Sequence, residues 1–407
     1  MRALSWLKDL MSSERGNVFV VAAAVMPLLL GSAAFAIDTI QLSVWKRQLQ
    51  RAADSSSIAG AYALSLGDNE HNAIHRDLDK NAFPTLSQEE AIAVGPRLGF
   101  DQTVRVTLTA SRTLPFMSIF TKSPTRMVAD STAALVGGGE FCMVSLYEGK
   151  DAGIDANGGA KINLGCGMKS NCTGEQCVTA GGNSSIKAEP IAAVGGIDGD
   201  SNNFVKPTTL QPHSAVQRDP FAYLPDPAVP SNCSSEVLTA ANAPTVSGTY
   251  CYAGIDVNPS DTLNLPPNST WIVNGGDVNF QGDVNAPKST IVMTGPNGAA
   301  GDLKINSQAN LIMSSPDSGP YKGVLFYRDR RAANIEIKIN GGSESKLTGA
   351  LYFPSSDITY AGGASTDVEC LQMVGQKLKF RGGATITNKC EGTGASSFNQ
   401  TVVRLVG

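Results

Sequence analysis

The chain has 407 residues, a formal net charge of −4 and 42 glycines, and charged side chains make up 17% of it. A net charge so close to zero gives no sign of a strongly basic surface, so nucleic acid is not an expected partner. The length allows two or more domains. Low charge with abundant glycine and small polar residues is more typical of a β-rich exported protein than of a cytosolic enzyme.

An uncharged apolar stretch covers residues 17–37. Its length matches the roughly 20 residues that a helix needs to cross a bilayer. We therefore predict a cytoplasmic tail and a transmembrane anchor over residues 1–37, with a helix that continues beyond the membrane to about Leu66. A cleaved signal peptide is the alternative, because Ala34-Phe-Ala36 resembles a small-residue cleavage site.

Residues 38–136 are predicted to form a small α+β, pilin-like module in which a long helix lies on an antiparallel sheet. Val104, Val106 and Leu108 alternate with polar residues, which is the period of two expected of a half-buried strand. The helix carries small residues at three- and four-residue steps, which let another element approach closely. These are Ala52, Ala53, Ser56, Ala59, Gly60 and Ala63. We interpret this stripe as packing against the chain's own strands, with a partner helix as the alternative.

Residues 140–407 contain a degenerate repeat, in which a short alternating strand, a glycine-rich turn and a second alternating strand follow one another. The last three glycine pairs begin at Gly341, Gly362 and Gly382, a step of about 20 residues. Repeats of this length stack, because one coil alone cannot bury its apolar strand face. The sequence therefore predicts a mainly β fold with a Gly/Asn-rich β-solenoid, and a β-sandwich is the alternative. A Pro-rich excursion over residues 198–231 is an ordered crossing or a surface loop.

All cysteines follow the apolar stretch, and their number is even, which is typical of disulfides in an oxidising compartment. They are Cys142, Cys166, Cys172, Cys177, Cys233, Cys251, Cys370 and Cys390. Cys370 and Cys390 are about one coil apart, and neighbouring strands lie about 4.8 Å apart, within the Cα separations that a disulfide accepts. We therefore predict a Cys370–Cys390 bond. Cys142–Cys166 and Cys233–Cys251 are further candidates, and Cys172–Cys177 follows only by elimination.

The sequence contains no recognisable catalytic constellation, such as GxSxG or a Walker A motif. Glycan-cleaving β-helix enzymes need clustered carboxylates or basic residues on one strand face, whereas Asp and Glu are scattered along this chain. We interpret Asp329, between Arg328 and Arg330, as part of a local ion pair. No catalytic residue and no cofactor is predicted.

Metal binding is also not expected. His71 and His75 are four residues apart, but two ligands without an HExxH pattern are too few for a metal site, so we place them on a solvated surface. Asp198 and Asp200 lack the spaced oxygen ligands of an EF-hand loop. No metal site is predicted.

The N-terminal third resembles TadG-type proteins of the tight-adherence (Flp/Tad) pilus assembly family. The resemblance is carried by Glu14-Arg-Gly-Asn17 before the apolar stretch, Ile37-Asp38 at its end, and residues 49–61 after it. A C-terminal likeness to one branch of the family rests on Asp219-Pro-Phe-Ala-Tyr-Leu-Pro225, Gly323-Val-Leu-Phe-Tyr-Arg-Asp329 and Leu347-Thr-Gly-Ala-Leu-Tyr-Phe-Pro354.

Two departures from related proteins narrow the expected role. Many TadG proteins carry a von Willebrand A domain with a DxSxS metal motif, and this motif is absent here. A type IV prepilin would carry Glu five residues after its cleavage glycine, but counting from Gly16 that position is Val21. Processing as a pilus subunit is therefore not expected.

The resemblance implies a membrane-anchored, non-enzymatic accessory protein of pilus assembly, surface attachment or biofilm formation. The expected partners are the lipid bilayer, other Tad assembly proteins or pilus subunits, and envelope glycans. The cysteines place the large C-terminal part in the periplasm, beyond the bacterial inner membrane. The alternative is an anchored extracytoplasmic β-helix carbohydrate-active enzyme, which carboxylates converging on one solenoid face would favour.

Overall fold

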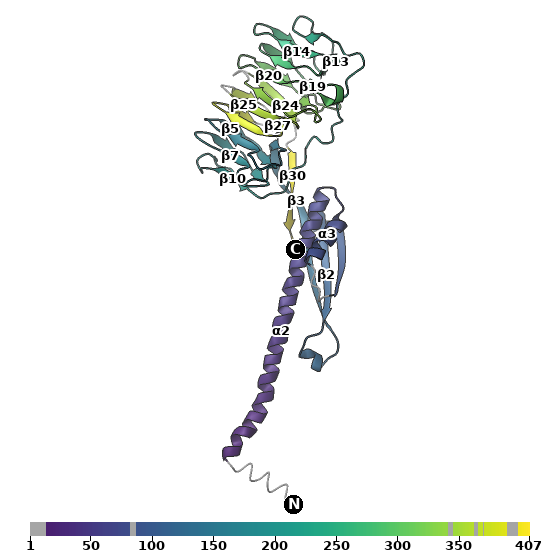
Figure 1. The fold of residues 1–407 in the computed structure, drawn as a ribbon, viewed down its shortest axis with the longest axis vertical. Coiled ribbons are helices and arrows are strands. Elements are labelled where there is room, and N and C mark those ends of the chain that lie inside the picture. Colours follow the sequence, from purple (N-terminus) through teal and green to yellow (C-terminus); the bar gives the residue numbers. More distant parts are fainter. Residues whose placement is uncertain (1–13, 82–86, 341–344, 362–364, 369, 389–397) are drawn as a thin grey trace, which may run out of the picture. The chain divides into compact units, whose positions relative to one another are not determined.

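The structure, a computed structural model, describes residues 14–81, 87–340, 345–361, 365–368, 370–388 and 398–407. These residues divide into two compact units, each of which is visible in Figure 1. The helical unit comprises the described residues up to Val136 together with Val403–Gly407, and the solenoid unit comprises those of Gly137–Val402. The strand β3 (Thr125–Ser145) contributes residues to both.

The helical unit begins with α2 (Glu14–Ser65), a helix of 52 residues. Its N-terminal half presents exposed apolar side chains, including Phe19, Leu28, Leu29, Leu30 and Phe35. Its part Val21–Ser65 contains a stretch that is apolar and long enough to cross a membrane, and no other helix in the described part of the chain does. The predicted long apolar helix is therefore confirmed. Pro27 and Ala34-Phe-Ala36 both lie inside it, and membrane helices tolerate such a proline.

The C-terminal half of α2 packs with α3 (Glu70–Lys80) on an antiparallel sheet, in the strand order β1–β2–β3 with β30 beside β3. The bounds are β1 (Ser87–Arg97), β2 (Phe100–Arg112), the short 3₁₀ helix η1 (Met117–Ile119) and β30 (Phe398–Leu405). Along β2, Val104, Val106 and Leu108 are fully buried and alternate with more exposed neighbours. The structure thus has the helix-on-sheet arrangement that the alternation predicts.

The stripe of small residues on α2 faces this sheet and α3. Ala53 and Ser56 are completely buried, and the Ser57 and Ser131 hydroxyls lie 3.0 Å apart. A Cβ atom at Gly60 would lie 2.7 Å from the Ile74 side chain, so any larger residue would displace its neighbours. The interpretation of the stripe as internal packing is confirmed, and the alternative of a partner helix at this stripe is wrong because the stripe is already covered.

The solenoid unit is a stack of parallel strands arranged on three faces, and the β-sandwich alternative is wrong. Face A has the order β11-β9-β6-β3-β27-β24-β22-β19-β16-β13, and face B has the order β10-β7-β4-β28-β25-β23-β20-β17-β14-β12. Face C combines the group β26-β29-β5-β8 with the group β15-β18-β21.

The strand bounds follow, face by face. Face A contains β6 (Gly167–Ser170), β9 (Ile191–Ala193), β11 (Leu210–Gln211), β13 (Thr249–Tyr252), β16 (Thr270–Asn274), β19 (Thr290–Thr294), β22 (Val324–Arg328), β24 (Lys346–Phe353) and β27 (Cys370–Gly375) besides β3. Face B contains β4 (Ile154–Ala156), β7 (Val178–Ala180), β10 (Ile197–Gly199), β12 (Val237–Leu238), β14 (Gly254–Val257), β17 (Val278–Phe280), β20 (Leu303–Ile305), β23 (Glu336–Ile339), β25 (Asp357–Ala361) and β28 (Leu378–Arg381). Face C contains β5 (Lys161–Leu164), β8 (Ser185–Lys187), β15 (Thr262–Asn264), β18 (Asp283–Ala286), β21 (Leu311–Ser314), β26 (Ser365–Val368) and β29 (Thr385–Asn388), and a 3₁₀ turn, η2, covers Pro296–Gly298.

The coils are not stacked in the order of the sequence. The chain enters in the interior of the stack at β3, and its next coils, through β6 and β9, build outward to β11 at one end. It then starts again at the opposite end with β12 and β13 and coils back until β27 pairs with β3, with Met373 opposite Met143. The last coil of the second segment therefore stacks directly on the first coil of the first.

Alternation along the strands builds the core. In β20, Leu303 and Ile305 are buried while Lys304 between them is exposed, and most strands of face B repeat this pattern. Glycine is required at the corner beside β4, where Gly158 has φ +73° and a Cβ atom would lie 3.2 Å from the Gly382 backbone nitrogen. The predicted glycine pairs at Gly341 and Gly362 lie outside the described residues.

The Pro-rich excursion is an ordered crossing, which we call the strap (residues 212–232). It follows β11 and passes the end of β9, where the Ser214 amide donates to the Ala193 carbonyl at 2.9 Å. It ends beside β13, where Cys233 is bonded to Cys251. Its predicted start at residue 198 is too early. The strands β10 and β11 still belong to the stack, so the repeat continues to Gln211.

We expect truncation of the central strap residue to destabilise the solenoid unit. The Phe221 ring is buried and lies 5.1 Å from the Tyr352 ring and 5.2 Å from the Phe398 ring, centroid to centroid. Phe221→Ala should lower the free energy of unfolding by about 3–5 kcal/mol, measured by urea denaturation of the full chain in detergent. Val216→Ala, at an exposed strap residue, is the control and should change it by less than about 0.5 kcal/mol. Equal effects of the two variants would contradict this role of Phe221.

Candidate functional site

The three passages that carry the C-terminal likeness meet at the strap. The Tyr352 hydroxyl donates to the Asp219 carboxylate at 2.6 Å, and the Tyr352 ring packs 5.0 Å from the Tyr327 ring. Burial and the neighbouring Asp219 carboxylate raise the pKa of the Tyr352 hydroxyl well above its ordinary value. The hydroxyl therefore stays protonated and continues to donate, so these residues form a packed structural cluster.

Two arginines that follow β22 hold the strap by hydrogen bonds and an ion pair. Arg330 donates to the Leu224 carbonyl at 3.0 Å and lies 3.4 Å from the Asp226 carboxylate, and Arg331 donates to the Pro227 carbonyl at 3.2 Å. Backbone carbonyls of an irregular segment need such donors, because no strand partner satisfies them. These bonds explain how a Pro-rich segment can lie in one conformation across the sheet.

The local ion pair predicted for Asp329 exists, but its partner is different. The buried Asp329 carboxylate lies 2.6 Å from Arg331, whereas Arg328 donates to backbone carbonyls and to the Ser356 hydroxyl. Burial acts to raise the pKa of Asp329, but hydrogen bonds from Arg331 and Thr294 outweigh it and hold that pKa below its ordinary value. Arg331 is held beside this carboxylate because its backbone amide also donates to it, at 2.9 Å.

A buried lysine fastens the first part of the strap. Lys169, on β6, is completely buried, and its ammonium group donates to the Ser214 hydroxyl. Burial lowers the pKa of Lys169 to about 7. An amine of this kind beside a hydroxyl can activate a nucleophile, but the Ser214 hydroxyl donates to the Ala193 carbonyl at 2.8 Å. The hydroxyl proton therefore points away from the amine, and the Lys169–Ser214 pair serves as a structural hydrogen bond that holds the strap.

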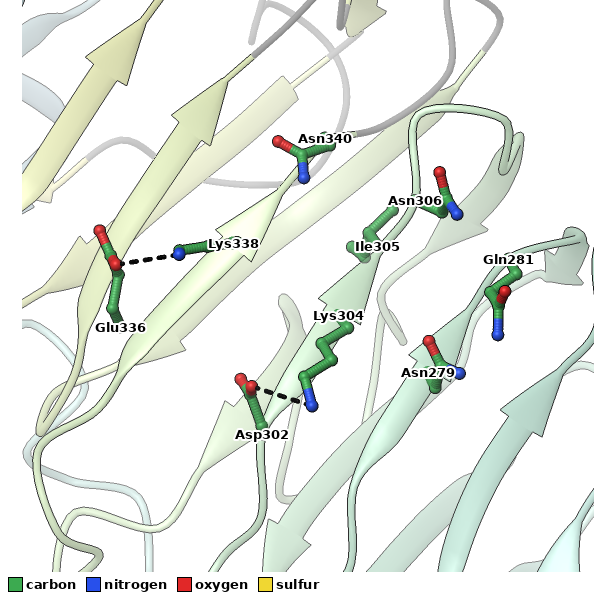
Figure 2. Close-up of a pocket in the computed structure, with 9 residues that line it drawn as sticks. All are labelled: Asn279, Gln281, Asp302, Lys304, Ile305, Asn306, Glu336, Lys338 and Asn340. Atoms are coloured by element: carbon green, nitrogen blue, oxygen red, sulfur yellow. Dashed lines mark ion pairs between the residues drawn. The ribbon is translucent and has the colours of Figure 1, made fainter.

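The outer side of face B carries an open groove lined mostly by polar side chains. The groove has a volume of about 690 Å³. Figure 2 shows its lining side chains, which come from β17, β20 and β23 and from the residues that flank these strands. It is lined by Asn279, Gln281, Asp302, Lys304, Ile305, Asn306, Glu336, Lys338 and Asn340. Parallel register places Asn279 beside Lys304 and Lys304 beside Lys338, so the outward residues form rows along the stack.

Several carboxylates that are scattered along the sequence lie on this one face, each beside a lysine. Lys304 lies 3.5 Å from Asp302 and 3.6 Å from Asp277, and Lys338 lies 3.5 Å from Glu336. Residues that are far apart in the sequence become neighbours here because each coil adds one strand about 4.8 Å from the last. Periodicity within one strand gives no sign of this convergence.

The chemistry of these carboxylates suits binding better than proton transfer. A hydrogen bond from the Thr359 hydroxyl, 2.7 Å away, is the main reason that the pKa of Glu336 lies below its ordinary value. A general acid in glycoside cleavage needs the opposite, a carboxyl whose pKa is raised. The lining amides and lysines give the groove further hydrogen-bonding groups, since Asn279, Lys304 and Lys338 lie side by side on neighbouring strands.

The predicted cysteine and histidine sites have the following positions. The structure contains the disulfides Cys142–Cys166, Cys172–Cys177 and Cys233–Cys251. Cys142–Cys166 joins the neighbouring coils of β3 and β6, with Cα atoms 5.8 Å apart. Cys390 lies outside the described residues, so the Cys370–Cys390 bond stays a prediction.

The two histidines lie on α3, and His75 is 3.1 Å from the Glu90 carboxylate on the helical unit's surface. Across the part of the chain that the structure describes, no group of three metal-ligating side chains comes together.

Lys169 should make the stability of the solenoid unit depend on pH. Its pKa is about 7 in the folded chain and 10.5 in an unfolded one, so between these values only the unfolded state binds the proton. The free energy of unfolding should therefore rise with pH across this window, by at most about 1.4 kcal/mol per pH unit. Below pH 7, Lys169 is protonated in both states and should add no pH dependence. Urea denaturation between pH 7 and pH 9 should show the rise in the wild type and not in Lys169→Met. Parallel curves for the two proteins would contradict this.

Comparison with known proteins bears on the N-terminal helix. Residues 16–63 match the family model described as "Putative Flp pilus-assembly TadE/G-like", and they lie entirely within α2. No curated protein and no solved structure matches the chain. The apolar helix and the match together indicate a membrane-anchored protein. The N-terminal segment of this chain thus matches the TadE/G-like family of Flp pilus assembly, as its resemblance to TadG-type proteins implied.

Proposed function

We propose that the protein is a non-enzymatic, membrane-anchored accessory protein of Flp/Tad-type pilus assembly, with a role in surface attachment or biofilm formation. The observation that carries the proposal is the coincidence of the family match with α2, the helix able to cross a membrane. The parts would be a tail and anchor over residues 1–37, a helix-and-sheet module over 38–136, and a solenoid over 140–407 that makes contact with partners.

The topology belongs to the proposal. The tail before the apolar stretch would be cytoplasmic, and the solenoid would lie in the periplasm beyond the bacterial inner membrane. Support comes from the three disulfides between described cysteines, which lie in the solenoid unit, because disulfides form and persist in oxidising compartments. A Cys370–Cys390 bond is proposed to complete the set.

Face B is the surface that we propose for contact. Face A is covered by the strap, whereas on face B the side chains of Asn279, Lys304, Lys338, Thr359 and Lys379 follow one another from strand to strand. A row with this spacing suits an extended partner that runs along the stack, such as a strand of a pilus or assembly protein, or an envelope glycan. Its paired charges would give specificity and orientation more than raw affinity.

The convergence of carboxylates on face B is the one observation that favours the enzyme alternative, a β-helix protein that cleaves glycans. The depressed pKa of Glu336 opposes it, because a carboxylate that stays ionised cannot act as a general acid. The two functions differ in their response to a single conservative substitution, which removes catalysis but only weakens an extended contact.

Complementation of a deletion strain tests the contact function. We expect deletion of the gene to reduce surface piliation or attachment. Glu336→Gln and Asp302→Asn should each restore the phenotype, whereas the double variant Lys304→Glu/Lys338→Glu should not, because it reverses the charge of the row. Lys161→Glu/Lys187→Glu, on face C, is the matched control and should complement. The purified protein should release no glycan fragments, and an activity abolished by one Asp→Asn or Glu→Gln change would establish the enzyme instead.

Protease added to spheroplasts tests the topology. The solenoid should be degraded while a tag on the N-terminal tail remains protected, because the two lie on opposite sides of the membrane. A cytoplasmic protein serves as the control for intact cells. Full protection of the solenoid would overturn the proposed orientation.

A further inference from the structure

The helical unit carries a second apolar feature besides α2, at the tip of the β2–β3 hairpin. This tip, residues 114–121, is an ordered loop around η1 that is closed by its own backbone, since the Ser118 amide donates to the Leu114 carbonyl at 3.0 Å. It exposes the residues Ile119 and Phe120, which are 75% and 87% exposed. Two neighbouring large apolar side chains exposed to water forgo the free energy that their burial would give, which favours an apolar occupant of this surface.

A single residue of α2 sets the position of the loop. Asp38 is 4% exposed, and its carboxylate accepts hydrogen bonds from the Met117 amide at 2.6 Å and the Phe116 amide at 3.2 Å. Figure 1 shows the hairpin tip alongside α2 within the helical unit. The loop is therefore tied to one level of the helix by bonds to a charged acceptor, which are stronger than those to a neutral one.

That level is the end of the apolar stretch. Asp38 is the first charged residue after residues 17–37, and such a stretch extends about 30 Å as a helix, the thickness of the hydrocarbon core. The Asp38 carboxylate would be costly at this boundary if it had no donors, and the two loop amides provide them. The exposed side chains of the tip thus lie where hydrocarbon gives way to headgroups.

The residues of α2 that follow Asp38 also indicate that the membrane boundary lies near Asp38. Trp45 is two turns further along α2, and the Arg112 guanidinium stacks on its ring with 4.6 Å from Cζ to the centroid. Tryptophan and arginine are typical of the interfacial zone, where an aromatic body and a charged group meet both environments. Lys46 and Arg47 follow directly and are exposed.

We propose that the hairpin tip inserts Ile119 and Phe120 into the outer leaflet of the same bilayer that α2 spans. The lipid bilayer is the occupant because the tip is continuous with the membrane-spanning part of α2 through Asp38. The helical unit thereby gains a second attachment to the membrane, which restricts its tilt and rotation about the helix axis. This inference rests on the membrane anchoring in the proposed function, but it does not depend on a role in pilus assembly.

Lipid quenching of an added tryptophan tests the insertion. The full chain is reconstituted into nanodiscs of phosphatidylcholine and phosphatidylglycerol, with and without bromine on the acyl chains. Phe120→Trp should add a blue-shifted emission that loses most of its intensity in brominated lipid. Leu98→Trp is the matched control, at an exposed apolar residue in the β1–β2 turn, and its added emission should not be quenched.

The role of Asp38 is tested in the Phe120→Trp background. Asp38→Ala removes the acceptor for both loop amides and should reduce the quenching, whereas Thr39→Ala, at an exposed helix position, should leave it unchanged. Added emission of Phe120→Trp that brominated lipid does not quench overturns the proposal, whether it is blue-shifted by a second copy or not shifted at all. A chain that does not enter nanodiscs would instead refute the membrane anchoring on which the inference rests.

Discussion

The solenoid depends on one junction, at which the coil β27–β28–β29 stacks on the coil β3–β4–β5. The groups that meet there are far apart in the sequence; the Ser145 hydroxyl, for example, donates to the Gln376 carbonyl across 231 residues. Until this junction forms, each segment ends in an unpaired strand edge, which invites pairing with other chains. Its closure carries a large entropic cost that only the complete core repays, so the two segments stabilise each other.

The strap is the geometric consequence of this topology. A chain that ends its first segment at one end of the stack and begins the second at the other must cross the whole sheet. The crossing is made in one conformation because Arg330 and Lys169 satisfy its polar groups and Phe221 fills its centre. The passages that carry the C-terminal likeness lie in this crossing and on the strands beneath it, so their residues are explained by packing.

The exposed surfaces differ in chemistry and therefore in what they can contact. The outer side of face B presents lysines and carboxylates that neutralise one another in pairs, which suits a polar, extended partner. The tip of the β2–β3 hairpin presents bare apolar side chains at the level where the apolar stretch of α2 ends, which suits lipid. A membrane-anchored protein with both surfaces can hold one orientation at the bilayer while its solenoid makes specific contacts.

The sequence by itself determined the features that depend on near neighbours: the apolar helix, the alternation of strands such as β2, and the glycine turns of a stacked repeat. Each of these follows from periodicity over a few residues. Only the tertiary structure decided the order of the coils, the gathering of Asp302 and Glu336 on face B, and the bond between Asp38 and a loop almost 80 residues away. The physical reason is that parallel strands with the same alternation can stack in many orders. Which side chains become neighbours is settled by the closure of the core, and no local pattern records it.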